Sequence, residues 1–273
     1  MNNHRIDLCL LVIFLTLLSD NVVKAQQDTL QLKVWYITKF KTYEEQKRPQ
    51  EEKTILEVGA VRRNFFSPIV NRKEFVVDSL TRAGVSRDEF LSEIYKYPSP
   101  KFVDRFFINF PKPGKLTSTH KSMTYYTYEE DIEQPQWRLL SDTLSIVGYP
   151  CIAAECDYRG RQWKAYYTLS IPVDAGPWKL SGLPGLILRA EDSTGDFSFE
   201  CVGIQKGKGK LLFTPTLKKH VSCTRQELME LIRRAKKDFV GYMKQYGLDA
   251  TQSWDANGNP IKYKPQTALF LDN

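Results

Sequence analysis

Short runs of aromatic and β-branched residues, divided by tight turns, limit the possible folds of this chain more than any other feature. Turn residues such as Arg159-Gly160 and Ser193-Thr194-Gly195 leave no room for a crossover helix between neighbouring runs. Strands joined so closely pair as antiparallel hairpins, so the pattern predicts an antiparallel meander. The expected strands cover residues 30–37, 54–62, 106–110, 123–128, 137–140, 144–158, 161–168, 186–190 and 197–204.

Helix signals lie on either side of these runs. A short helix is expected over residues 76–83, and Ser86 with Glu89 has the spacing of a capping box that opens another. A further capping box, Thr224 with Glu227, opens the most regularly amphipathic segment of the chain. Its apolar residues recur at steps of three and four: Leu228, Leu231, Ile232, Ala235, Phe239 and Met243.

These patterns predict one fold class. Hydrophobic residues make up 42% of the chain and aromatic residues 12%, enough to form a packed core, which excludes general disorder. We expect an α+β fold that is mainly β: a curved antiparallel sheet, in outline a half-barrel-like meander, with a C-terminal amphipathic helix packed on it. A single domain is expected over residues 26–273.

The N-terminus has the pattern of a secretory signal peptide over residues 1–25. Arg5 precedes an apolar stretch at 8–18, and Val23-Lys24-Ala25 offers small residues at both specificity positions of a cleavage site. The stretch is too short to span a bilayer, and no other apolar run is comparable, which excludes a polytopic membrane protein. The chain is therefore expected to be exported to the periplasm, and to stay there, associate with the outer membrane or be secreted.

The positive charge of the chain is concentrated in one segment. The net charge is +7, and residues 206–237 hold ten basic residues against Glu227 and Glu230. The basic face of the expected C-terminal helix could meet an anionic surface or an acidic partner, whereas export argues against nucleic acid. The alternative is a solvated helix face that keeps the protein soluble. The patch consists of Arg233, Arg234, Lys236 and Lys237.

Four cysteines follow the expected cleavage site. An even number in an oxidising compartment permits two disulfides, and buried free thiols are the alternative. Cys151 and Cys156 lie on one expected strand, on opposite faces and too far apart to bridge each other, so only pairings with Cys201 and Cys223 stay open. Strand phasing directs Cys156 and Cys201 inward. No spacing resembles a metal site, and no cofactor is expected.

Residues 176–188 contain an unbroken Gly-Leu-Pro-Gly-Leu-Ile hexapeptide. This segment resembles the GLPGLI family of Bacteroidota, which are exported proteins without an assigned biochemical function. Further blocks at 55–59, 137–139, 146–149 and 171–173 are similar to the family in the same order. The resemblance implies one exported, β-rich domain. Tyr166 departs from it, because the family has a tryptophan there.

The hexapeptide can also be interpreted physically. Pro184 and Gly185 have the residue types of a type II turn, in which the glycine takes a positive φ, and the turn would lead into an apolar strand. One reading is a structural corner that fixes strand register. The other is an aromatic-rimmed pocket on one side of the sheet. Its residues would be Trp163, Tyr167, Trp178, Gly182, Leu183, Pro184 and Gly185.

No catalytic motif is present. The expected mature chain has two histidines and no Gly-x-Ser-x-Gly motif, and the adjacent acids Glu129, Glu130 and Asp131 do not form the separated pair that a glycosidase needs. We therefore expect a non-catalytic binding, carrier or scaffold protein of the cell envelope, whose partner is an apolar or peptide-like ligand or another envelope protein. The alternative is an envelope hydrolase without a recognisable motif. A binder should have an apolar concavity, and an enzyme should have a paired histidine or perturbed carboxylates in a cleft.

Overall fold

The computed structural model describes residues 28–272 apart from 211, 216, 218 and 256. The expected signal peptide lies outside these residues. Over the described part, the chain is mainly β, with one 12-stranded sheet and four α-helices. The strands are β1 (Leu32–Phe40), β2 (Gln50–Val58), β3 (Arg63–Phe66), β4 (Asp104–Ile108), β5 (Lys115–Lys121), β6 (Tyr125–Asp131), β7 (Arg138–Ile146), β8 (Tyr149–Tyr158), β9 (Arg161–Thr168), β10 (Leu186–Asp192), β11 (Phe197–Lys206) and β12 (Val221–Ser222).

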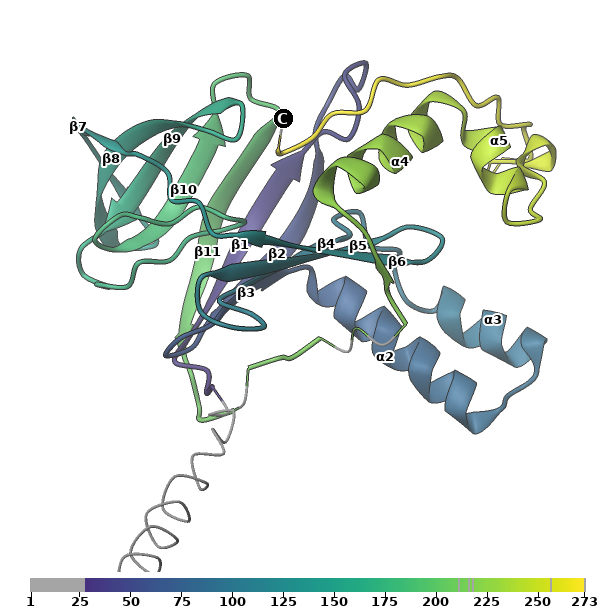
Figure 1. Cartoon of the computed structure of the whole chain (residues 1–273), viewed down its shortest axis with the longest axis horizontal. Helices are drawn as coiled ribbons and strands as arrows, with labels where there is room; N and C mark the ends of the chain where they lie inside the picture. The colour runs from purple at the N-terminus through teal and green to yellow at the C-terminus, as the bar shows by residue number, and fades with distance from the viewer. Residues whose placement is uncertain (1–27, 211, 216, 218, 256, 273) are drawn as a thin grey trace, which may run out of the picture.

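The sheet consists of two meanders joined at one junction. Its strand order is β12-β6-β5-β4-β3-β2-β1-β11-β10-β9-β8-β7, so neighbours in the sheet are consecutive in the chain except at β1–β11 and at β12–β6. All pairs are antiparallel apart from the short parallel pair β12–β6. The predicted mainly β fold with antiparallel pairing is therefore confirmed, but the expected single meander is divided between β6 and β7. The junction of β1 with β11 is a long-range pairing that local patterns do not indicate (Figure 1).

The helices are α2 (Pro68–Ala83), α3 (Arg87–Tyr95), α4 (Arg225–Lys237) and α5 (Phe239–Lys244), followed by a 3₁₀ turn, η1 (Ala250–Gln252). Ser67 caps α2, which is longer than expected, and Gly84 ends it at a φ of 63°. The predicted capping box of Thr224 and Glu227 opens α4. The expected single C-terminal helix is broken at Asp238, because this side chain accepts a hydrogen bond from the amide of Gly241 and starts α5 instead.

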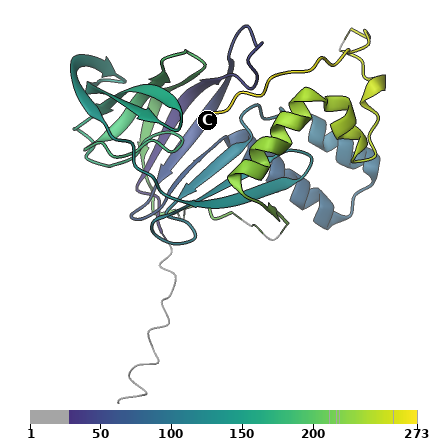
Figure 2. The same cartoon turned by 45° about the horizontal axis from the view of Figure 1, so that its top comes forward.

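Opposite faces of the sheet carry different helices. On β4, Arg105 points to α2, where it pairs with Glu74, and Phe106 points to the side of α4. Arg105 is buried and also donates to Thr119 of β5, at 3.0 Å. This ion pair fixes α2 on one face. Figure 2 shows α4 across the other face, with the C-terminal segment running back from α5 to the sheet.

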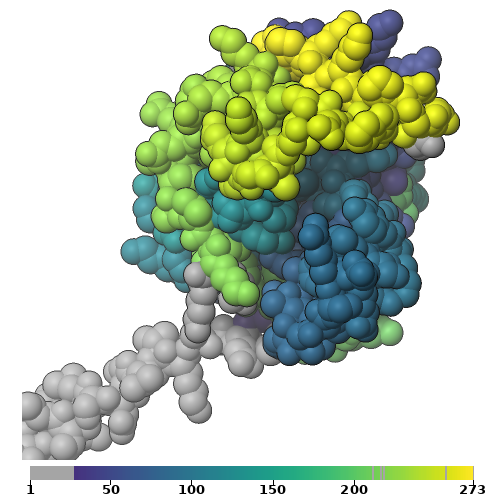
Figure 3. All heavy atoms as spheres, turned by 90° about the vertical axis from the view of Figure 1, so that its right-hand side faces the viewer, coloured from purple at the N-terminus to yellow at the C-terminus, as the bar shows by residue number. Residues whose placement is uncertain are grey.

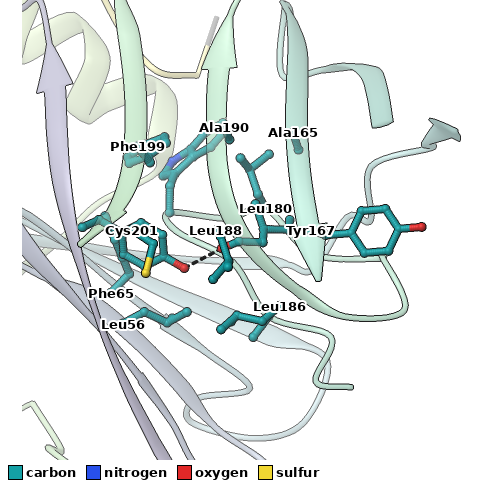
Figure 4. Close-up of a cluster of buried hydrophobic side chains, with 14 of the residues drawn as sticks. Leu56, Phe65, Ala165, Tyr167, Leu180, Leu186, Leu188, Ala190, Phe199 and Cys201 are labelled. Carbon is teal, nitrogen blue, oxygen red and sulfur yellow. Dashed lines mark hydrogen bonds between the residues drawn. The ribbon is translucent and has the colours of Figure 1, made fainter. Parts of the chain in front are cut away.

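The main core lies where β1, β11 and β10 meet. Alternate residues of β1 point into it, and the hydroxyl of Tyr36 donates to the carbonyl of Ile187 at 2.6 Å. Leu186 and Leu188 of β10 lie in the same cluster as Leu56 of β2 (Figure 4). Because β10 is apolar on both faces, it needs cover on both sides, as the sequence predicts for a buried strand.

Candidate functional site

A cavity of about 1040 Å³ separates α4 from the sheet. The apolar stripe of α4 therefore faces the sheet across an open space instead of packing directly on it. The surface is hollowed between the C-terminal segment and the α2–α3 pair, as Figure 3 shows. Aromatic side chains of the sheet half of the molecule form one wall: Phe40, Phe102, Phe106, Tyr128, Trp178 and Phe197. The helices and the C-terminal segment supply the other: Leu228, Met229, Leu231, Ile232, Ala235, Phe239, Leu269, Phe270 and Leu271.

Trp178 connects this cavity to the core. Its side chain is 1% exposed, lies 5.4 Å from the ring of Trp163, and lines the cavity. Trp163 stacks in turn on Phe199 at 6.0 Å. The backbone of Trp178 has a φ of 56°, a conformation that is costly for a bulky residue and persists only where its surroundings enforce it. Within the described residues, its indole nitrogen has no hydrogen-bond partner.

Lys179, the next residue, is the centre of a buried ion-pair network. Its ammonium lies 2.6 Å from Glu130 and 2.5 Å from Asp272, and it donates to the hydroxyl of Tyr128 at 3.3 Å. Arg159 joins the network at 3.0 Å from Glu130. Burial alone would lower the pKa of Lys179, but the neighbouring negative groups outweigh it and raise that pKa. The network holds β6, the segment before β10 and the C-terminal segment together.

A second cation fixes the C-terminal segment over the cavity. Arg161 donates two hydrogen bonds to the carbonyl of Phe270, at 3.0 and 2.7 Å, and pairs with the buried carboxylate of Asp192 at 2.7 Å. With Lys179 on Asp272, this gives the segment two charged anchors. The cavity wall at residues 269–272 is therefore held by buried electrostatic contacts as well as by apolar packing.

The cavity also contains a paired histidine. Nδ1 of His120 lies 2.7 Å from the carboxylate of Asp104, its cross-strand neighbour, and both residues line the cavity. With Nδ1 engaged by a carboxylate, Nε2 is left to face a ligand or a water molecule. Nearby, the hydroxyls of Ser122 and Tyr242 share a hydrogen bond of 2.7 Å. No group of residues in the described ranges has the composition of a metal site.

The predicted basic patch is split by the structure. Arg233, Arg234 and Lys237 are exposed, and the guanidinium of Arg233 lies 5.2 Å from the ring of Phe270. Lys236 instead turns inward, lines the cavity and donates to the hydroxyl of Thr42 at 3.2 Å. It follows the apolar residues by one position, so its long side chain reaches the cavity wall.

The predicted pocket residues do not form one site. Trp178 lines the large cavity, whereas Trp163 and Tyr167 belong to the core. Leu183 is buried in that core and Pro184 is exposed. Gly182 has a φ of 90°, and a Cβ atom added there would lie 3.5 Å from the ring of Trp137. The hexapeptide therefore lies mainly outside the cavity lining.

The predicted type II turn is wrong in one respect. Gly185 does not have the positive φ that such a turn requires; Gly182 has one instead. Gly185 is buried against β9, and a Cβ atom there would lie 2.1 Å from the carbonyl oxygen of Thr168. The position requires glycine because two backbone segments approach each other closely, and not because of its dihedral angle.

The four cysteines of the described part of the chain are free thiols. Cys151, Cys156 and Cys201 are buried, and Cys223 is half-buried. The inward orientation of Cys156 and Cys201 agrees with the strand phasing. Burial raises the pKa of Cys156 to about 12 and that of Cys201 to about 11, so both stay protonated at neutral pH.

Most of the cavity lining was not predicted from the sequence. Lys179 lies within the segment around the hexapeptide, and a lysine between a tryptophan and a leucine is a signal for a buried cation that needs partners. The inward position of Lys236 could have been found from its place four residues after Ile232, on the edge of the apolar stripe. The contribution of residues 269–272 has no comparable local signal.

Fold and site define a mainly β protein with a large, half-enclosed apolar cavity. A family model described as a protein of unknown function (Porph_ging) matches residues 156–189, which include Trp163, Trp178, Lys179 and the hexapeptide. No curated protein matches the sequence. Two solved structures of PNGF-II, in space groups P21 and C2, each match with 12% identity and a TM-score of 0.49 over 76% of this chain. This chain spans about a third of those structures, 34% and 33% of their length. Among the described residues, no helix has the length and hydrophobicity needed to cross a membrane.

Proposed function

We propose that this chain is an exported binding or carrier protein of the cell envelope, that its ligand is apolar, and that it belongs with the GLPGLI-like proteins its hexapeptide resembles. The cavity of about 1040 Å³ between the sheet and α4 carries the proposal. Ligand sites of small molecules are typically concave and mostly apolar, with a few polar groups, at volumes of about 300–1,000 Å³. Aromatic side chains supply most of the sheet wall, and Trp178 in that wall packs against Trp163 of the core.

The half-barrel outline is part of the same proposal. β6 and β7 lie ten strand positions apart in the sheet order, yet only residues 132–137 connect them. A flat sheet would separate them by roughly 48 Å, whereas this connection spans at most roughly 25 Å. The ion pair between Arg159, after β8, and Glu130 of β6 supports the same curvature. A sheet curved in this way provides the concave wall that a carrier needs.

Export is the first test. We expect the mature protein from envelope fractions to begin at Gln26, because cleavage should follow Val23-Lys24-Ala25. N-terminal sequencing of the purified protein measures this directly. A cytoplasmic protein that keeps Met1 would contradict the proposal.

Ligand binding is the second test. Ala235 lines the cavity from α4, so Ala235→Trp should fill part of it and weaken binding of the neutral fluorescent probe N-phenyl-1-naphthylamine at least tenfold. Lys237→Trp places the same side chain on the outer side of α4 and is the matched control. We expect the control to bind within twofold of wild type. Equal affinity of all three proteins, or no binding by wild type, would contradict an apolar ligand site.

The histidine pair supports one second candidate, a hydrolase that cleaves acyl esters. His120, oriented by Asp104, would take a proton from water through Nε2; the hydroxide adds to the ester carbonyl, and the leaving alkoxide takes the proton back. Products are one carboxylic acid and one alcohol.

This candidate predicts slow hydrolysis of p-nitrophenyl dodecanoate by wild type. His120→Gln should lower the rate by about 10²–10⁴-fold, to the rate in buffer. His220→Gln is the control, because His220 lies outside the cavity lining and stacks on Tyr125. A wild-type rate equal to that in buffer excludes this candidate and leaves the binding protein.

A further inference from the structure

The cavity lining carries an excess of positive charge. Six basic side chains line it, against two acidic ones, Asp104 and Asp272. Both carboxylates are already engaged, Asp104 by His120 and Asp272 by Lys179. An uncharged apolar ligand would leave this excess of positive charge without a counter-ion. The six basic residues are Lys41, Lys101, Arg225, Lys236, Lys262 and Lys264.

Lys236 differs from the other cations of the lining. Lys41 pairs with Asp196 at 2.7 Å, and Arg225 lies 3.9 Å from Glu130. Lys101 donates to a backbone carbonyl, and Lys262 and Lys264 are exposed. Among the described residues, the ammonium of Lys236 has no carboxylate within 4.0 Å; it contacts the hydroxyl of Thr42 and lies 5.2 Å from the ring of Tyr43.

The position of Lys236 brings this charge to the end of an apolar wall. Leu228, Leu231, Ile232 and Ala235 lead along α4 to it, and it lies in the last turn, where a cation complements the helix dipole. Burial lowers the pKa of Lys236, which reflects the cost of keeping an ammonium ion in poorly hydrated surroundings. A counter-ion from outside the chain would reduce this cost.

We infer that the cavity binds a single-chain amphiphile with one carboxylate head, which pairs with Lys236 while the chain lies between α4 and the aromatic wall of the sheet. Among the described residues of the lining, Lys236 is the half-buried cation without a carboxylate partner, and its single charge matches one negative charge, which favours a carboxylate over a phosphate dianion. The rings of Phe40 and Phe102 pack edge to face, with their centroids 5.3 Å apart, and offer an apolar surface to the chain. This inference rests on the proposed binding function and specifies its ligand class.

The test compares two ligands that differ only in the head group. Dodecanoate and dodecan-1-ol displace N-phenyl-1-naphthylamine from the mature full-length protein at neutral pH. Lys236→Met keeps an apolar side chain of similar length and removes the charge. Lys237→Met makes the same change on the exposed side of α4, and Lys236→Arg keeps the charge.

We expect Lys236→Met to weaken dodecanoate at least tenfold while dodecan-1-ol stays within twofold of wild type, because a charge-assisted hydrogen bond of about 1.5–3 kcal/mol corresponds to at least a tenfold change in affinity. Lys237→Met and Lys236→Arg should both keep dodecanoate binding. The retained alcohol binding shows that the variant is folded.

The outcomes separate this inference from the proposed function. If dodecan-1-ol binds and dodecanoate is unaffected by Lys236→Met, or if Lys237→Met weakens dodecanoate equally, the carboxylate site is wrong and the apolar cavity stands. If Lys236→Met weakens both ligands equally, the charge has no role and the inference is again overturned. If neither ligand displaces the probe, or the probe does not bind wild type, both proposals fail.

Discussion

Lys179→Met should lower the free energy of unfolding by about 3 kcal/mol, since removal of one partner from a buried ion pair leaves the other charge uncompensated. The Lys179 side chain is 1% exposed and bridges Glu130 and Asp272. Arg159 stays near Glu130, at 3.0 Å, and keeps the loss near the lower end of the range for such pairs. Chemical denaturation followed by tryptophan fluorescence measures it.

The matched control is Lys164→Met. The ammonium of Lys164 lies 2.6 Å from Asp142, the same distance that separates Lys179 from Glu130, but this pair is exposed. Water screens an exposed pair, so little change in stability is expected. If both variants unfold at the same denaturant concentration as wild type, the network does not have the structural role assigned to it.

The same network predicts an acid dependence. Burial raises the pKa of Glu130, but Lys179 and Arg159 outweigh it and hold that pKa below its ordinary value of 4.5. A lowered pKa in the folded state means that the stabilisation is present above pH 4.5 and is lost as the pH falls through the folded value. The stability difference between wild type and Lys179→Met should therefore shrink as the pH is lowered below 4.5. A difference that stays constant down to acid unfolding would contradict this.

Gly185→Val is expected to have the second large effect. A Cβ atom at this position would lie 2.1 Å from the carbonyl oxygen of Thr168, a backbone atom of β9 that cannot move without disturbing the pairing of Thr168 with Leu186. Overpacking of this kind costs about 1–3 kcal/mol, and occasionally more. Because the conflict is with Cβ, Gly185→Ala should already show much of the loss in melting temperature.

Gly203→Ala is the control for this substitution. Gly203 lies in a strand, has no positive φ, and an added Cβ would meet only Trp35, at an ordinary contact distance of 3.8 Å. Alanine there should leave the melting temperature unchanged or slightly higher. Equal melting temperatures for Gly185→Ala and wild type would show that β9 does not approach the hexapeptide as closely as the structure has it.

The sequence predicts those parts of the fold that depend on local periodicity. The alternation around Val34 and Tyr36 identifies β1, and the capping box at Thr224 identifies the start of α4. Two local predictions are wrong because a side chain or a neighbouring segment determines the backbone conformation at that position. Asp238 competes for backbone amides and breaks the expected helix, and the close approach of Thr168, remote in sequence, determines the backbone at Gly185.

The sequence predicts that an apolar concavity exists, but it does not predict which residues line it. Its walls come from elements at both ends of the chain, such as Phe40 at the end of β1 and Phe270 in the C-terminal segment, and nothing local indicates that these residues meet. A helix stripe such as Leu228 and Ile232 is equally consistent with close packing on a sheet. Whether it packs or leaves a space depends on the sheet curvature and on the anchors at Lys179 and Arg161, which are long-range contacts.

The junction of β1 with β11 also determines the order in which this protein can fold. Within each meander most neighbouring strands are joined by short loops, which close quickly, although α2 and α3 separate β3 from β4. The two meanders join only when β1 pairs with β11, from Phe40 opposite Phe197 to Leu32 opposite Lys206. Until then β1 has an open edge, and such an edge can pair with another chain. We expect closure of this long loop to be the slow step of folding, and pairing of the open edge with another chain to compete with it more strongly at higher protein concentration. A chain that emerges N-terminus first exposes β1 until nearly the whole sheet has followed.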